Sequence, residues 1–150
     1  MLSIKTGFTE RNNVMWKILV VDDDRDMCRM TASILEEEGY RINKAYDGGQ
    51  AIKKIKAERC DLMILDYKLT DMDGIKVLEE VRQTEPDLKV IMISAFGSPS
   101  IKSAAKKLGT YKFLDKPFDL YRLVKVVKNA LAEKSGTICQ STGREVDRFS

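Results

Sequence analysis

The chain has 150 residues, 43% of them apolar, and its 26 basic and 23 acidic side chains give a formal net charge of +3. This length supports one domain with a hydrophobic core and leaves little room for a second. The nearly balanced charge argues against direct nucleic-acid binding by this chain. No apolar run could span a bilayer and residues 1–16 lack the apolar core of a secretion signal, so we expect a cytoplasmic protein without membrane contact.

Histidine is absent, and the three cysteines, Cys28, Cys60 and Cys139, are widely spaced. The absence of histidine excludes the Ser-His-Asp and Cys-His catalytic systems, His-ligated metals and a phosphohistidine on this chain. Cysteines in this number and spacing are typical of reduced cytosolic thiols and form no zinc motif. We interpret Cys28 as a core residue of a helix. Any chemistry must therefore come from carboxylates, hydroxyls and lysines.

Short apolar runs alternate five times with segments of helical periodicity, which is typical of a repeated strand–helix unit. The first, third and fourth runs are wholly apolar and predict parallel strands buried on both faces, whereas the second and fifth are more polar and predict less buried strands. The sequence therefore predicts an α/β fold, a doubly wound parallel sheet of five strands with helices on both faces. The expected strands are 18–21, 41–45, 62–65, 90–93 and 111–114.

Between these strands, apolar residues recur three and four positions apart, as on one face of a helix. For the first helix we expect this face to hold Met27, Met30, Thr31, Ile34 and Leu35, and we expect the helix to end at Gly39. Four aspartates precede helices as candidate N-caps: Asp24, Asp47, Asp73 and Asp119.

The two ends of the chain differ from this pattern. Residues 1–15 and 134–150 are polar and show no periodicity. We predict a flexible N-terminal extension, a single domain over residues 16–133, and a flexible C-terminal tail or linker.

Carboxylates follow two of the wholly apolar runs at the point where each run ends, and they would meet if the two strands are neighbours in the sheet. Asp22 and Asp23 come after the first run, and Asp66 comes after the third. Parallel strands place their carboxyl ends at one edge of the sheet, so we expect these three side chains to meet. Like charges so close raise one another's pKa unless a cation joins them, and oxygen-only ligands suit Mg²⁺. The sequence therefore predicts a Mg²⁺ site at this edge.

Ser94 and Lys116 follow the fourth and fifth runs and are expected at the same edge. Taken alone, each has an ordinary explanation, as a strand exit and as a surface lysine. Together with the carboxylates they supply a nucleophile, a metal platform, a hydroxyl and an ammonium group. These are the groups that accept and hold a phosphoryl group.

At these residues the chain resembles the receiver domains of two-component response regulators. The resemblance covers residues 16–133 and implies a flavodoxin-like sheet with strand order 2-1-3-4-5. The segments that carry it are 17–24, 61–68, 72–74, 91–95 and 113–118.

The resemblance also implies a role for each site residue. Asp66 becomes the phosphoacceptor, and Ser94 and Lys116 contact the phosphoryl group. The implied Mg²⁺ ligands are Asp22, Asp23, Asp66 and the backbone carbonyl of Lys68. Ser94 and Phe113 form the implied switch pair, and the Lys116–Pro117 peptide bond is expected to be cis.

The implied function is signalling rather than enzymatic turnover. A sensor histidine kinase or a histidine phosphotransfer protein would donate the phosphoryl group from a phosphohistidine. The domain would catalyse its own phosphorylation and, slowly, its own dephosphorylation, and the product would switch a protein-interaction surface. The downstream target or output domain, and a phosphorylation-dependent homodimer, stay open.

Three positions depart from the family pattern. Thr70 replaces a usual proline, so we expect a looser loop after Asp66. Phe113 replaces tyrosine and carries no hydroxyl. Phe96, two residues after Ser94, is bulky and is expected to slow the access of water to the phosphoryl group.

Three other functions fit parts of this sequence. A phosphatase of the haloacid-dehalogenase type also forms an aspartyl phosphate, but Lys68 occupies the position of its second aspartate. A flavodoxin-like electron carrier would need a phosphate-binding loop where Asp22 and Asp23 place negative charge. A receiver-like interaction module with a vestigial pocket is opposed by the complete set of site residues.

Overall fold

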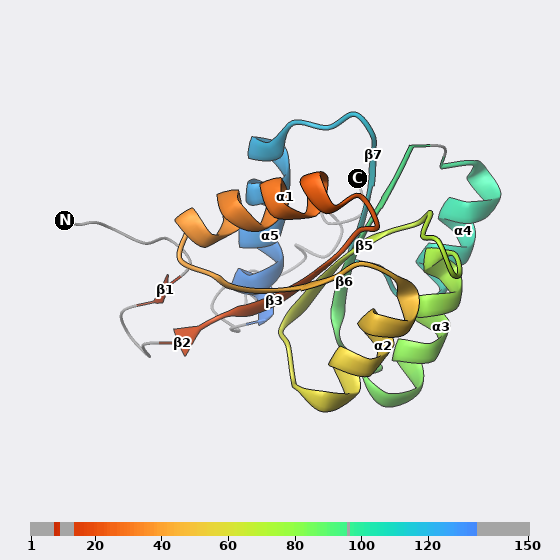
Figure 1. Cartoon of the computed structure of the whole chain (residues 1–150), viewed down its shortest axis with the longest axis horizontal. Coiled ribbons are helices and arrows are strands. Elements are labelled where there is room, and N and C mark those ends of the chain that lie inside the picture. The colour runs from red at the N-terminus through yellow and green to blue at the C-terminus, as the bar shows by residue number, and fades with distance from the viewer. Residues whose placement is uncertain (1–7, 10–13, 96, 135–150) are drawn as a thin grey trace.

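In the computed structural model the described residues are 8–9, 14–95 and 97–134. Their main elements alternate strand and helix along the chain (Figure 1). These elements are β3 Lys17–Val21, α1 Arg25–Glu37, β4 Arg41–Ala45, α2 Gly48–Ala57, β5 Leu62–Asp66, α3 Gly74–Thr84, β6 Lys89–Ser94, α4 Pro99–Lys107, β7 Lys112–Asp115 and α5 Leu120–Lys134.

Two further strands precede this series, within the segment expected to be an extension. They are β1 Phe8–Thr9 and β2 Val14–Met15, and they pair antiparallel in a separate sheet. The predicted flexibility of residues 1–15 and 134–150 stays a prediction, because most of these residues lie outside the described ranges. No helix among the described residues is long and apolar enough to cross a bilayer.

The main sheet has the order β4-β3-β5-β6-β7, and all its pairs are parallel. Apart from the two short strands, this is the predicted order 2-1-3-4-5 of a flavodoxin-like fold. The edge strands are β4 and β7, the two predicted to be less buried, and each has only one buried residue. The central strand β5 is buried at every position.

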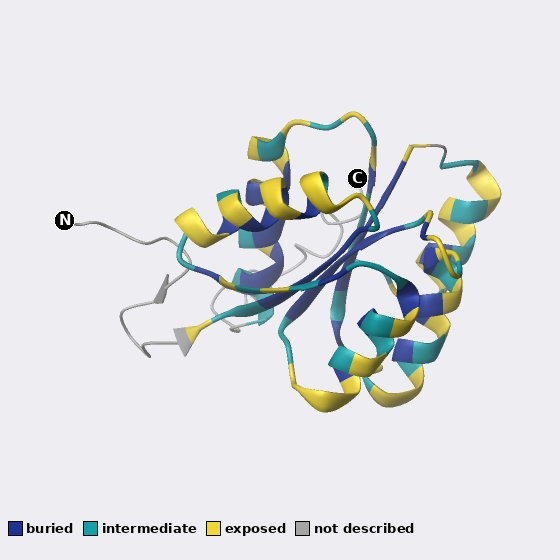
Figure 2. Ribbon diagram, viewed as in Figure 1, coloured by how far each residue is buried: buried dark blue, intermediate teal, exposed yellow. Residues whose placement is uncertain are grey.

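Helices cover both faces of the sheet, and each face has its own hydrophobic core (Figure 1). Side chains of α1 and α5 pack with Ile18, Val20 and Ile64 on one face. Side chains of α2, α3 and α4 pack with Leu19 and Leu65 on the other. Figure 2 shows the strands as a buried layer, with the exposed residues on the outer sides of the helices. This alternation follows from the opposite directions of successive side chains in a strand.

The predicted face of α1 needs one correction. The buried stripe is Cys28, Thr31, Ala32 and Leu35, and Met30 is 52% exposed. This stripe follows the same three- and four-residue spacing as the predicted one, but it is shifted by about one position around the helix. The interpretation of Cys28 as a core residue is confirmed, and burial raises the pKa of its thiol to about 11.

The predicted helix ends are confirmed. The carboxylates of Asp24, Asp47 and Asp73 accept backbone N–H bonds from the first turns of α1, α2 and α3. Asp119 accepts the N–H of Tyr121 at 2.9 Å at the start of α5. After α1, Gly39 takes a φ of 99°, which glycine adopts without strain. These caps fix where each helix begins relative to the strand before it.

Candidate functional site

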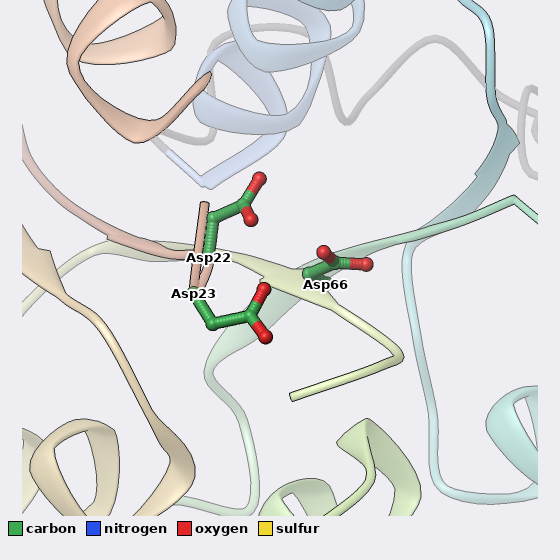
Figure 3. A group of neighbouring side chains, drawn as sticks. All are labelled: Asp22, Asp23 and Asp66. Atoms are coloured by element: carbon green, nitrogen blue, oxygen red, sulfur yellow. The ribbon is translucent and has the colours of Figure 1, made fainter. Parts of the chain in front are cut away.

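The three carboxylates predicted to meet lie together at the carboxyl edge of the sheet (Figure 3). Asp22 and Asp23 directly follow β3, and Asp66 is the last residue of β5, its neighbour in the sheet. One carboxylate oxygen from each of the three lies within 4.8 Å of the others. Because these oxygens come from two adjacent strands, the backbone register brings the negative charges together.

Burial makes this concentration of charge unfavourable. The residues Asp22 and Asp66 are only 7% and 6% exposed. Burial raises the pKa of Asp22 to about 6. The backbone N–H of Asp24, which donates to Asp22 Oδ1 at 2.9 Å, opposes this rise, whereas the Asp66 carboxylate adds to it. The cluster therefore has an excess of negative charge and attracts a cation.

The donor set fits a hard divalent ion. All the clustered side-chain ligands are carboxylate oxygens, and among the described residues the group includes no histidine or cysteine. Mg²⁺ prefers oxygen ligands, needs few protein groups and keeps several of its own waters. The side chains present thus suit Mg²⁺ better than a soft metal.

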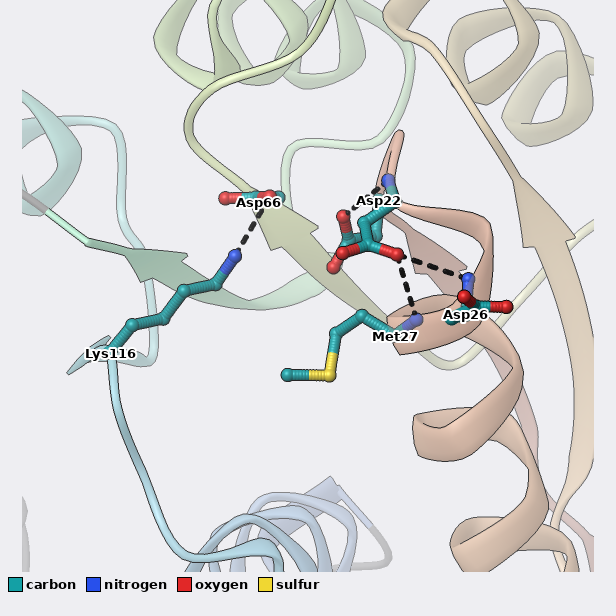
Figure 4. Close-up of polar contacts among 6 residues, drawn as sticks. Asp22, Asp26, Met27, Asp66 and Lys116 are labelled. Atoms are coloured by element: carbon teal, nitrogen blue, oxygen red, sulfur yellow. Dashed lines mark hydrogen bonds and ion pairs between the residues drawn. The ribbon is translucent and has the colours of Figure 1, made fainter.

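Lys116 reaches the cluster from the loop after β7 (Figure 4). Its Nζ lies 3.2 Å from Asp66 Oδ2, and its side chain is 26% exposed. The backbone N–H of Lys116 donates to the carbonyl of Ser94 at 2.8 Å, which links this loop to the end of β6. Ser94 is the last residue of β6 and is 3% exposed. The Lys116–Pro117 bond is cis, as predicted.

The loop between β5 and α3 is held by contacts that we did not predict. Lys68 pairs with Asp73 through an isolated bridge, and the N–H of Gly74 donates to the carbonyl of Tyr67. The carboxylate of Asp71 accepts the N–H groups at the start of α2, more than twenty residues earlier in the chain. The predicted loosening of this loop at Thr70 stays untested, but the loop is tied at several points.

Gly74 lies against the end of β5. A Cβ at this position would be 2.9 Å from the carbonyl oxygen of Asp66 and 2.9 Å from the Cα of Tyr67. Both obstacles are backbone atoms, so they could yield only if the strand end moved. From the sequence, Asp73 was predicted to cap a helix and residues 72–74 belonged to the family resemblance, but neither prediction included this close approach of Gly74 to β5.

We therefore expect Gly74→Ala to lower the free energy of unfolding by about 2 kcal/mol, as overpacking does. Gly49→Ala is the matched control, because it also adds a methyl group to the first turn of a helix. A Cβ at Gly49 would approach no atom closer than 3.5 Å. Urea denaturation of both variants measures the difference, and equal stabilities would show that the close approach at Gly74 carries no strain.

Phe113, which the family resemblance predicts to be a switch residue, lies on the face of the sheet that carries α4. It pairs in register with Met92, two positions before Ser94, so Phe113 and Ser94 belong to the same face. The ring is half-buried, and a Cβ on Gly97 would lie 2.6 Å from its Cε1 atom. Lys102 Nζ is 5.5 Å from the centre of the ring. Phe96 lies outside the described residues, so its predicted effect stays a prediction.

Comparison with known proteins agrees with this geometry. The sequence pattern of the response regulator receiver domain matches residues 18–128. The nitrogen assimilation regulatory protein NtrX of Azorhizobium caulinodans is 40% identical over 116 residues, which are 76% of this chain and 26% of that protein. Sporulation initiation phosphotransferase F of Bacillus subtilis is 34% identical over 119 residues, which are 79% of this chain and 96% of that protein.

Among solved structures, the CheX-CheY-BeF3-Mg²⁺ complex of Borrelia burgdorferi contains a chain that is 28% identical, with a TM-score of 0.80 over 86% of this chain and 98% of that one. The chain described here belongs to the response regulator receiver domain family of two-component signalling systems. Accepting a phosphoryl group is typical of this family. The chain spans about a quarter of the length of the first curated relatives it matches.

Proposed function

We propose that this receiver domain accepts a phosphoryl group on Asp66 in a Mg²⁺-dependent reaction. The donor is a phosphohistidine on a sensor histidine kinase or a histidine phosphotransfer protein. One observation carries the assignment to Asp66: its carboxylate belongs to the acidic cluster and also contacts the Lys116 ammonium at 3.2 Å. Among the described residues, neither of the other two carboxylates of the cluster forms an ion pair with a lysine.

The proposed metal ligands are Asp22, Asp23, Asp66 and the backbone carbonyl of Lys68. When bound, Mg²⁺ neutralises the phosphoryl oxygens and helps to hold the group in line for transfer. The metal also offsets the repulsion among the carboxylates, which burial makes severe at Asp22. The Borrelia burgdorferi relative, whose structure contains BeF3 and Mg²⁺, supports a metal-dependent reaction by analogy.

In the transfer step a carboxylate oxygen of Asp66 attacks the phosphorus atom. The new O–P bond forms as the P–N bond to the donor's imidazole breaks, and the imidazole nitrogen keeps the electron pair. Lys116 then pairs with a phosphoryl oxygen in place of the Asp66 oxygen, and the Ser94 hydroxyl donates a hydrogen bond to another. The same groups later hold the phosphoryl group while water attacks it. The domain thus catalyses its own phosphorylation and slow dephosphorylation, without acting on a separate substrate.

Phosphorylation would be read out on the surface of α4, β7 and α5. A hydrogen bond from Ser94 to the phosphoryl group would move the end of β6, and Phe113, on the same face of the sheet, would turn inward. Near its ring, Lys102 and Asp115 form an ion pair at 3.0 Å that such a movement would disturb. A second copy of the domain, a protein target or an output domain would bind the changed surface. We place these events in the cytoplasm, where the cysteines stay reduced.

Intact mass spectrometry after incubation with acetyl phosphate and Mg²⁺ tests this proposal. We expect one phosphoryl adduct on the unmodified protein, no adduct in the presence of a metal chelator, and no adduct on Asp66→Asn. Asp73→Asn is the control, because it removes a nearby exposed carboxylate while asparagine still caps α3. An unmodified protein that forms no adduct would favour the interaction module with a vestigial pocket.

A further inference from the structure

The loop that follows the proposed phosphoacceptor is tied to the start of α2 by one carboxylate. Asp71 Oδ1 accepts the backbone N–H of Gly48 at 2.8 Å, and Asp71 Oδ2 accepts that of Gly49 at 2.9 Å. Both donors belong to the first turn of the helix, where N–H groups have no partner within the helix. The hydrogen bond from Gly48 is the main cause that lowers the pKa of Asp71, so the carboxylate is charged at neutral pH.

Apolar contacts made by residues on either side of Asp71 also hold the β5–α3 loop against α2. Leu69 is 8% exposed and belongs to the core beneath α2 and α3. Met72 packs so closely on the helix that a Cβ at Gly48 would lie 2.5 Å from its Cγ atom. Asp71 thus lies between two apolar anchors, the buried Leu69 and the partly buried Met72, whereas its own side chain is at the surface. Lys68, whose carbonyl is a proposed metal ligand, directly precedes the first anchor.

We propose that Asp71 is a positioning residue for Mg²⁺: by fastening the β5–α3 loop to α2, it holds the Lys68 carbonyl in place for the metal. This inference rests on the proposed function, since it requires a metal at the carboxylate cluster. A carbonyl on a loop binds a metal well only if the loop is already ordered, because ordering it upon binding would cost conformational entropy. Groups that orient metal ligands typically change metal affinity 10–100-fold when they are lost.

The carboxylate is suited to this task by its two equivalent acceptor atoms. The N–H groups of Gly48 and Gly49 point at different oxygens of Asp71. Asparagine replaces one of these oxygens by an NH2 group, which donates and does not accept, so in this geometry it satisfies only one of the two N–H groups. An alanine satisfies neither. The proposal therefore predicts a graded loss of Mg²⁺ affinity, which we expect to be about threefold for Asp71→Asn and about tenfold for Asp71→Ala.

Thermodynamic linkage gives a second consequence that needs no substitution. If the hydrogen bonds of Asp71 with Gly48 and Gly49 raise the Mg²⁺ affinity by a given factor, bound Mg²⁺ must strengthen these hydrogen bonds by the same factor. The tie protects the Gly48 and Gly49 amide hydrogens from exchange with solvent. We therefore expect saturating Mg²⁺ to slow the exchange of these two amides about tenfold in the unmodified protein, matching the loss of affinity in Asp71→Ala.

Asp47→Ala is the matched control. Asp47 is the N-cap of the same helix, and its carboxylate accepts the N–H of Gln50 at 2.7 Å. Removing it weakens the start of α2 but leaves the β5–α3 loop attached through Asp71. Titration calorimetry with MgCl2 measures the affinity of each variant, and hydrogen exchange followed by NMR measures the two amides with and without the metal.

The outcomes separate this inference from the proposed function. Reduced Mg²⁺ affinity in the Asp71 variants alone, with slower amide exchange in the presence of Mg²⁺, supports the positioning role. An unmodified protein that binds Mg²⁺, together with Asp71→Ala that binds it as tightly as Asp47→Ala, would overturn this role and leave the proposed function standing. An unmodified protein that binds no Mg²⁺ would overturn both.

Discussion

Replacing Asp22 by asparagine is expected to raise the free energy of unfolding of the metal-free protein at pH 7 by about 2–3 kcal/mol. The pKa of Asp22 rises from 3.8 to about 6 on folding, mainly because the carboxylate is buried. One unit of pKa corresponds to about 1.4 kcal/mol, so holding this side chain ionised at pH 7 destabilises the folded state. Asparagine has nearly the same shape, and its oxygen can still accept the N–H of Asp24.

This prediction has a definite pH dependence. Because the folded-state pKa lies above the unfolded-state value, the folded protein binds more protons than the unfolded chain between pH 3.8 and about 6. The contribution of Asp22 to stability is therefore greatest below pH 3.8 and is lost as the pH rises through about 6. The difference between Asp22→Asn and the unmodified protein should be largest at pH 7 and should close as the pH falls towards 3.8.

Urea denaturation in the presence of a metal chelator, at a series of pH values, measures this difference. Asp24→Asn is the control, since it removes one negative charge from the same loop and asparagine is an equally good N-cap. Saturating Mg²⁺ should reduce the advantage of Asp22→Asn, because the metal stabilises the protein that binds it better. If Asp22→Asn is no more stable than Asp24→Asn at pH 7, the buried, ionised carboxylate of Asp22 does not destabilise the folded state as described.

Replacing Lys116 by methionine is expected to separate metal binding from phosphorylation. The ammonium group lies 3.2 Å from Asp66 Oδ2 and also lowers the pKa of Asp22. Without it, the cluster has less positive charge, so Mg²⁺ should bind several-fold more tightly. Phosphorylation should nevertheless become about 100-fold slower, as is typical when a donor to developing oxyanion charge is lost.

Titration calorimetry gives the Mg²⁺ affinity, and the time course of adduct formation with acetyl phosphate gives the rate. Lys102→Met is the matched control, because it also replaces a lysine that pairs with an aspartate. Lys102 Nζ lies 3.0 Å from Asp115 Oδ2 at the end of β7, and Asp115 does not belong to the acidic cluster. Its affinity and rate should be close to those of the unmodified protein. If Lys116→Met is phosphorylated as fast as Lys102→Met, Lys116 takes no part in the reaction.

The features that could be predicted from the sequence are those with a local signal. The apolar run 62–65 could only be a buried strand, and the aspartate after it had to lie at the end of that strand. Convergence of Asp22, Asp23 and Asp66 followed once the two strands were taken as parallel neighbours. The order of the strands and the cis bond at Lys116–Pro117 came from the family resemblance and not from periodicity.

The features that could not be predicted depend on contacts between distant segments. The tie from Asp71 to Gly48 and Gly49 joins two loops, and no spacing rule connects them. The misplacement of Met30 has a simpler cause: an amphipathic pattern gives the width of a buried stripe better than its centre. The side chains of successive helix residues point about 100° apart. A shift of the buried stripe by one position therefore turns a residue at the margin of the predicted stripe, such as Met30, towards the solvent.

Locating the phosphoryl group on the chain tests the central claim most directly. Borohydride reduces an aspartyl phosphate to homoserine, and the position of homoserine can be determined by peptide mass spectrometry. After treatment with acetyl phosphate and Mg²⁺, we predict homoserine at position 66 alone. Homoserine at position 22 or 23, or none in a protein that has bound Mg²⁺, would contradict the assignment of Asp66 as the phosphoacceptor.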